Sequence, residues 1–207
     1  MAKTSGKAHG GNIAAAVIIT VLGLLVLGGV IYYSVLKTNS TPKYFKSDKA
    51  AAAEKLYDKI MGYDFENHYP PAPEDVMDAY NDIFLILYGD MIIDDQILRQ
   101  MVDKQRELYS DELTAAQTAE EQVANLKGNL AELENLGVYC TRVEKKATLS
   151  DANDKDSCVV RAILYFKGAE VMYRNYYLAF DNDDKRWKVS NWAQTDENFD
   201  LLDAEEE

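Results

Sequence analysis

Histidine and cysteine are scarce in this chain, which has only two of each among 207 residues. Two cysteines without a CxxC motif cannot form a disulfide scaffold, and on their own they cannot build a structural zinc centre. Cys140 and Cys158 flank a hairpin that we expect to centre near Asn153, which would put them out of register. We therefore expect two buried free thiols, with a disulfide between neighbouring strands as the alternative.

The known catalytic motifs are also missing. His9 lies in a short N-terminal tail and His68 in the connector NHYPP, and there is no GxSxG, HExxH or Gly-rich phosphate loop. Two Asp-rich segments, 151–156 and 181–184, lack the glycine and glutamate of a calcium loop, so we interpret them as turns. The sequence thus predicts no catalytic, cofactor or metal residue.

Basic residues are outnumbered. The chain has 22 Lys and Arg against 35 Asp and Glu, a net charge of −13. Because the first 37 residues contain three lysines and no acid, the remainder has 19 basic and 35 acidic residues, a net charge of −16. Such a domain has no basic surplus to displace counterions from phosphates, so we do not expect it to bind nucleic acid.

One long hydrophobic segment is present. Ile13–Leu36 contains 24 residues and no charge, and Tyr32 and Tyr33 stand near its far end. As a helix it would extend roughly 36 Å, enough to cross a hydrocarbon core of about 30 Å. A cleaved signal peptide usually has a shorter apolar core and a small-x-small site. We therefore predict an uncleaved single-pass anchor, with the lipid bilayer as partner and the cell membrane as location.

The lysines on the two sides of this segment are compatible with either orientation in the membrane. Two lysines precede it and four follow it, and that count favours a cytoplasmic C-terminal side. A short basic N-terminus before a first apolar helix is instead the usual arrangement when the long domain is exported. We expect the C-terminal domain to be extracellular.

Composition and periodicity divide the chain into five parts. We expect a disordered tail (1–12), the transmembrane helix (13–36), a linker and helix (37–62), an α+β soluble domain (63–196) and an acidic tail that frays (197–207). Helices are predicted over 50–61, from Pro73 to Gly89, from Asp94 or Asp95 through Tyr109, and from the capping box at Thr118 to Gly137.

After Gly137 the hydrophobic period changes from 3.6 to 2. Strands are predicted over 138–149, 158–166, 170–180 and 186–192, separated by turn sequences. Three to four helices followed by an antiparallel meander of about four strands indicate an α+β fold with helices on one face of the sheet. The element order and the final strand RWKVSNW resemble the nuclear-transport-factor-2-like cone.

A closer resemblance covers roughly residues 65–196. The segments NHYPPAPEDVMDAYNDIFLILYGD, DDQILRQMVDKQRELYSDEL and RWKVSNWAQTD are similar to an uncharacterised family of single-pass membrane proteins from anaerobic Gram-positive gut bacteria, a domain of unknown function. The resemblance implies this topology and a place in the bacterial envelope. It implies no catalytic residues.

Aromatic residues are dense in the predicted sheet, and alternation sends about half of them away from the core. We take Tyr173, Tyr177 and Trp192 as a candidate partner surface, since such side chains bury area and keep a polar tip. Cross-strand pairing on a half-exposed sheet would also explain them.

The function we expect is a membrane-anchored, non-enzymatic binding or assembly module of the cell envelope, without cofactor and with an envelope protein as partner. Membrane-anchored, cone-fold subunits of conjugation and secretion channels share this topology. The alternative is a ligand-binding or catalytic cone with an apolar pocket, using a pair such as Tyr80 with Asp78 or Asp82.

Overall fold

Five helices precede four strands in the computed structural model, which describes residues 50–90, 94–150 and 154–202. The helices are α2 (Ala50–Met61), α3 (Pro73–Tyr88), α4 (Asp95–Arg106), α5 (Asp111–Ala115) and α6 (Ala119–Leu136). Among the described residues no helix is long and apolar enough to cross a bilayer. The predicted anchor Ile13–Leu36 and the tail before it lie outside the described residues.

Helix ends follow the capping signals in the sequence. Asp94 accepts a hydrogen bond from the backbone of Ile97 at the start of α4, and Thr118 and Glu121 form the predicted capping box of α6. Gly137 ends α6 in the left-handed conformation, at φ 66°. These groups satisfy backbone N–H and C=O groups that a helix end leaves free.

The region after α4 differs from the prediction. The helix ends at Arg106 instead of continuing through Tyr109, and the short helix α5 follows. The reason is a contact with strand β4 (Arg186–Thr195), because Val189 donates its backbone N–H to Leu108 O and accepts a bond from Ser110 N. Pairing with the sheet edge thus replaces the last turn of the predicted helix.

The strands β1 (Tyr139–Ser150), β2 (Ser157–Lys167), β3 (Met172–Asp181) and β4 form one antiparallel sheet in the order β1-β2-β3-β4. The predicted four-stranded meander and the α+β class are confirmed. Gly168 turns β2 toward β3 at φ 83°, and a Cβ there would lie 2.9 Å from Gly137 O, so this turn requires glycine.

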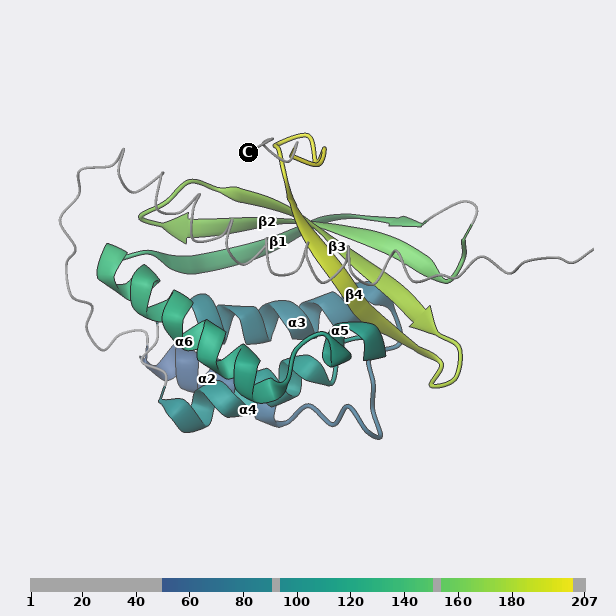
Figure 1. Ribbon diagram of the computed structural model, residues 1–207, viewed down its shortest axis with the longest axis horizontal. Helices are drawn as coiled ribbons and strands as arrows, with labels where there is room; N and C mark the ends of the chain where they lie inside the picture. The colour runs from purple at the N-terminus through teal and green to yellow at the C-terminus, as the bar shows by residue number, and fades with distance from the viewer. Residues whose placement is uncertain (1–49, 91–93, 151–153, 203–207) are drawn as a thin grey trace, which may run out of the picture.

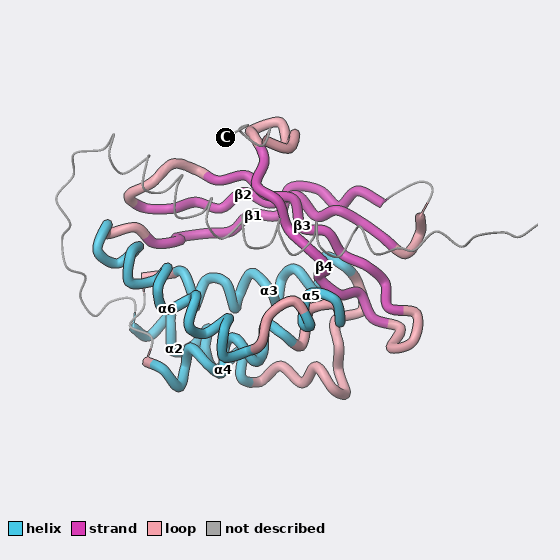
Figure 2. The backbone as a smooth tube through the Cα atoms, viewed as in Figure 1, coloured by secondary structure: helices cyan, strands magenta, loops and turns pink. Residues whose placement is uncertain are grey.

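All five helices lie on one side of the sheet (Figures 1 and 2). Helix α3 is the central one, since ten of its sixteen residues are buried and it packs against β1, β2 and β4. Alternate residues of β2 point toward the helices, and all five are buried: Cys158, Val160, Ala162, Leu164 and Phe166. We call this helix-covered side the inner face, and the opposite side the outer face.

The two cysteines are buried free thiols. Cys140 lies opposite Phe166 and Cys158 opposite Ser150, so they are out of register as predicted. Burial raises the pKa of Cys140 to about 12 and that of Cys158 to about 11. Neither forms a reactive thiolate at neutral pH.

A β-bulge at Ser190 changes which residues of β4 face inward. Tyr177 pairs with Asn191 and Leu178 with Val189, so Ser190 is an extra residue. Because side chains alternate along a strand, one extra residue reverses the faces of all that follow. Val189 and Trp192 are therefore both on the inner face, although regular alternation would separate them.

The chain beyond Thr195 folds back instead of fraying at once. The Asp196 carboxylate accepts bonds from the backbone of Asn198 and Asp200, and Leu201 forms a bridge with Thr195. The turn puts Phe199 at φ 66°, a conformation that costs a non-glycine residue energy. The predicted frayed tail is thus wrong for 197–202; residues 203–207 lie outside the described residues.

Candidate binding surface

An apolar stripe crosses the outer face of the sheet. Strand register places Leu149, Val159 and Tyr177 side by side on β1, β2 and β3, and we call these three residues the outer stripe. Leu149 is 43% exposed, and Val159 and Tyr177 are half-buried. Since every described helix lies on the inner side (Figure 1), none of them covers this stripe.

The C-terminal turn covers the neighbouring part of the outer face. The ring of Phe199 meets Tyr173 edge-on, with centroids 5.7 Å apart, and lies 5.1 Å from the Arg161 guanidinium. Asn175 donates its side-chain N–H to Phe199 O at 3.2 Å. The C-terminal turn therefore occupies the outer face around Tyr173, and no contact between this turn and Tyr177 is found among the described residues.

The three residues of the predicted partner surface do not lie on the same face of the sheet. Tyr173 and Tyr177 lie on the outer face, as expected from alternation. Trp192 does not join them, because the bulge at Ser190 turns it inward, where it is 8% exposed and packs 6.2 Å from the Tyr109 ring. That Tyr173 and Tyr177 bind a partner stays a prediction.

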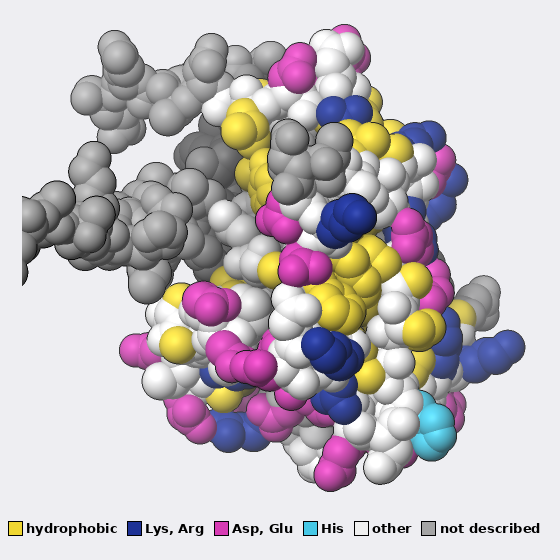
Figure 3. Space-filling model, turned by 90° about the vertical axis from the view of Figure 1, so that its right-hand side faces the viewer, with side chains coloured by type: hydrophobic (Ala, Val, Ile, Leu, Met, Phe, Trp, Pro, Cys, Tyr) yellow, Lys and Arg dark blue, Asp and Glu magenta, His cyan; other side chains and the backbone are white. Residues whose placement is uncertain are grey.

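Acidic side chains lie in the two hairpin turns at one end of the sheet. Asp156 joins these turns: its backbone O accepts from Phe180 N at 2.7 Å, and its carboxylate accepts from Asn182 at 2.8 Å. No Lys or Arg in the described part of the chain forms an ion pair with Asp154, Asp156 or Asp183, and all three are exposed. Figure 3 views this end and shows hydrophobic surface among charged side chains.

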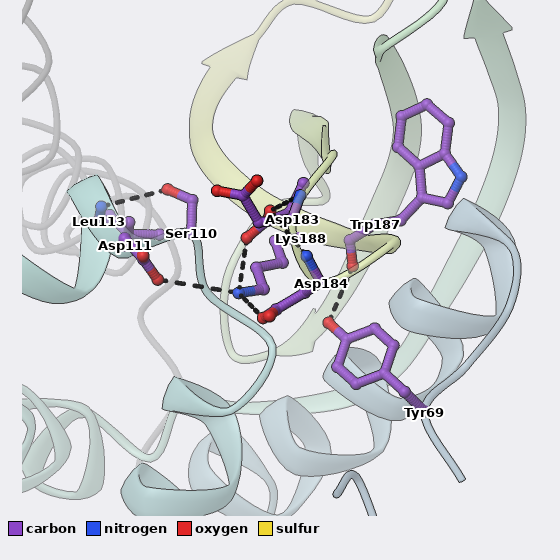
Figure 4. Close-up of polar contacts among 9 residues, drawn as sticks. Tyr69, Ser110, Asp111, Leu113, Asp183, Asp184, Trp187 and Lys188 are labelled. Carbon is purple, nitrogen blue, oxygen red and sulfur yellow. Dashed lines mark hydrogen bonds and ion pairs between the residues drawn. The ribbon is translucent and has the colours of Figure 1, made fainter. Parts of the chain in front are cut away.

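The acids nearest the β3–β4 turn have a structural role. Lys188 binds Asp184 at 2.8 Å and Asp181 at 3.0 Å, and approaches Asp111 of α5 at 3.7 Å (Figure 4). Burial opposes the charged form of Lys188, but its hydrogen bonds to Asp184 and Asp181 raise its pKa overall. These ion pairs connect the β3–β4 hairpin to α5.

A second contact holds the same hairpin from the loop before α3. Tyr69 donates its hydroxyl to Trp187 O at 2.8 Å (Figure 4), and burial raises the pKa of Tyr69. The position of the β3–β4 turn is therefore fixed by both α5 and the loop 63–72.

The inner face is an aromatic core. Tyr80 packs 5.3 Å from Tyr176 and 6.3 Å from Tyr109, and burial raises the pKa of all three. The acid–base pair considered from the sequence does not form, because Asp78 binds Lys145 at 2.7 Å and Asp82 binds Lys59 at 2.6 Å.

The described residues contain no cluster of three or more His, Cys, Asp or Glu that could hold a metal ion. His68 is exposed beside Asp64, at 3.2 Å, as expected for a residue of the connector.

The molecule is thus an α+β domain with a helix-covered inner face and an outer face that is partly covered by its own C-terminal turn. The chain belongs to the family described as domain of unknown function DUF6715, whose model matches residues 1–192. The resemblance to an uncharacterised family is confirmed at that level. No curated protein and no solved structure matches the chain.

Proposed function

We propose that this protein is a membrane-anchored, non-enzymatic binding or assembly module of the bacterial cell envelope. Ile13–Leu36 is its anchor, and the α+β domain, which we liken to a nuclear-transport-factor-2-like cone, lies outside the cell. The uncharged length of Ile13–Leu36 supports the anchor, and the family match includes this segment.

The observation that carries the binding function is the outer stripe. None of the described helices covers the outer face. A solvent-facing sheet surface usually carries polar residues, whereas here Leu149, Val159 and Tyr177 form one row across three strands. Apolar residues in a contiguous row on a surface are typical of an interface.

Charge indicates the chemistry of the partner. Asp154, Asp156 and Asp183 lie exposed in the hairpin turns at one end of the sheet, and the chain after residue 37 has a net charge of −16. Complementary potentials steer association and select partners. The partner is therefore a protein segment with apolar side chains between basic ones.

Photo-crosslinking tests this proposal. A benzophenone amino acid replaces Leu149 or Tyr177 in the full-length protein, which is expressed in the bacterium that naturally makes it. The matched control carries the same amino acid in place of Glu132, an exposed residue of α6. The expected result is one heterologous adduct from positions 149 and 177, reduced by high salt, and none from 132. Equal adducts from all three positions, no adduct, or an adduct of two copies of this chain would contradict it.

Labelling with a membrane-impermeant maleimide tests the orientation. Asp183→Cys places an exposed thiol at the hairpin turn, while Cys140 and Cys158 are buried. We expect labelling of the variant in intact cells and none of the unsubstituted chain. Labelling only after permeabilisation would put the domain in the cytoplasm.

A further inference from the structure

Arg174 is a buried arginine on the inner face of β3. It is 3% exposed, and no Asp or Glu among the described residues forms an ion pair with it. Removing an unpaired charge from water is strongly unfavourable. Proteins usually place an anion beside such a group.

The hydrogen bonds of Arg174 leave its Nε without a partner and give its Nη2 only a weak one. Nη1 donates to the Tyr176 hydroxyl at 3.4 Å, and Nη2 has Met172 Sδ, a weak acceptor, at 3.4 Å. Nε is buried and has no partner. Nε–H and Nη2–H point along the same edge, which a carboxylate can bridge with two hydrogen bonds.

Other unpaired groups and aromatic rings surround this edge. Trp192 Nε1 is a buried donor without a partner, and Trp192 stands on the same face as Arg174, two residue pairs along in the β3–β4 register. Gln194, directly opposite Arg174, also has an unpaired Oε1, and rotation of its amide would present the NH₂ group. The guanidinium lies 5.8 Å from the Phe84 ring and 5.7 Å from the Tyr176 ring.

We propose that Arg174 binds the carboxylate of a small organic acid, in a buried site between α3 and the β3–β4 half of the sheet. Nε and Nη2 of Arg174 hold the two carboxylate oxygens, and Trp192 Nε1 donates to one of them. The apolar part of the ligand lies against the rings of Phe84 and Tyr176. This site is on the opposite side of the sheet from the outer stripe and does not depend on the function proposed for that stripe.

Thermal unfolding of the full-length protein in detergent is the first test, with acetate and benzoate as probes. Acetamide and benzamide are the neutral counterparts, and chloride controls for ionic strength. We expect a carboxylate to raise the Tm by about 3 °C for each tenfold rise in concentration above its Kd. The amides and chloride should leave the Tm unchanged.

Arg174→Met should abolish the shift, and Arg174→Lys should weaken binding at least tenfold, since lysine cannot form the bidentate pair. Arg161→Met is the matched control, because Arg161 also has an unpaired Nε but lies on the outer face. Equal shifts from carboxylates and amides, or an unchanged shift in Arg174→Met, would overturn the proposal.

A second measurement does not depend on the folding of these variants. Trp187→Phe leaves Trp192 as the only tryptophan, because the chain has two. Acetate should change the Trp192 emission along a saturating curve, whereas acetamide should not. Emission that does not respond to either acetate or benzoate would refute the site.

Discussion

The two faces of the sheet are made from the same alternating strands but differ in what covers them. Tyr176 and Tyr177 are neighbours on β3, yet Tyr176 is fully buried against Tyr80 of α3 and Tyr177 is half-buried on the outer face. Aromatic content alone therefore does not distinguish core from surface. Among the described residues the difference lies in the layer above each face: five helices on the inner side and a seven-residue turn, 196–202, on the outer side.

The two faces of the sheet should therefore differ in how much they contribute to stability. Inner-face side chains contribute to folding through buried area, whereas the less buried side chains of the outer stripe should contribute less. Variants on the two faces should separate these contributions.

The largest expected effect is on the inner face. Leu164 is fully buried on β2, so Leu164→Ala should lower the free energy of unfolding by about 2–5 kcal/mol. Urea denaturation of the full-length protein, followed by circular dichroism, measures it. A loss below about 1 kcal/mol would show that the inner face is not closely packed.

The cluster around Lys188 should give the next effect. Lys188→Met removes charge-assisted hydrogen bonds to Asp181 and Asp184 and should cost about 1.5–3 kcal/mol at pH 7. It should also change the pH dependence, because the hydrogen bond from Lys188 is the largest cause that lowers the pKa of Asp181.

The sign of that pH dependence follows from linkage. The contribution of Asp181 is present above the ordinary pKa of 3.8 and is lost as pH falls through the lower folded value. The pKa of Lys188 is raised, so its contribution is present below 10.5 and is lost as pH rises through the folded value. Denaturation between pH 2 and 7 should show a smaller acid-induced loss in Lys188→Met than in the unsubstituted chain; equal losses would argue against the cluster.

The C-terminal turn should give a smaller effect, and it allows a matched pair. Phe199→Ala loses the contact with Tyr173 and keeps the unfavourable positive φ, so we expect a loss of about 1–2 kcal/mol. Phe199→Gly loses the same ring but relieves the backbone, and should be less destabilising than Phe199→Ala by about 0.5–1 kcal/mol. If both variants lower the free energy of unfolding equally, or not at all, the turn does not contribute to stability through its contact with the outer face.

The smallest effect on stability is expected in the outer stripe. Leu149→Ala is the counterpart of Leu164→Ala, yet at 43% exposure it should change the free energy of unfolding by no more than about 0.5 kcal/mol. The same variant should reduce the crosslinked adduct formed from position 177. An unchanged adduct yield would show that Leu149 does not belong to the partner surface.

Local signals in the sequence predicted much of this fold. The capping box at Thr118, the stop at Gly137 and the four strands all depend on interactions within a few residues or on a strict period of two. The out-of-register cysteines followed from the same alternation.

The errors occurred where tertiary contacts override local rules. Nothing in RWKVSNW marks Ser190 as a bulge, so Trp192 could not be assigned to the inner face. The end of α4 depends on the pairing of Leu108 and Ser110 with Val189, and the turn around Phe199 depends on Tyr173 and Asn175. Arg174 had no sequence signal beyond its position in an alternating strand.

Hydroxyl-radical footprinting of Tyr177 tests the central claim, that the outer stripe binds a partner at the membrane, most directly. Tyr177 modification is compared between native membranes and the protein purified in detergent. Tyr165 is the control, since it lies on the outer face against Arg142, away from the stripe. The account predicts that Tyr177 is protected in membranes and becomes reactive on purification, while Tyr165 does not change; equal modification of Tyr177 in both states would contradict it.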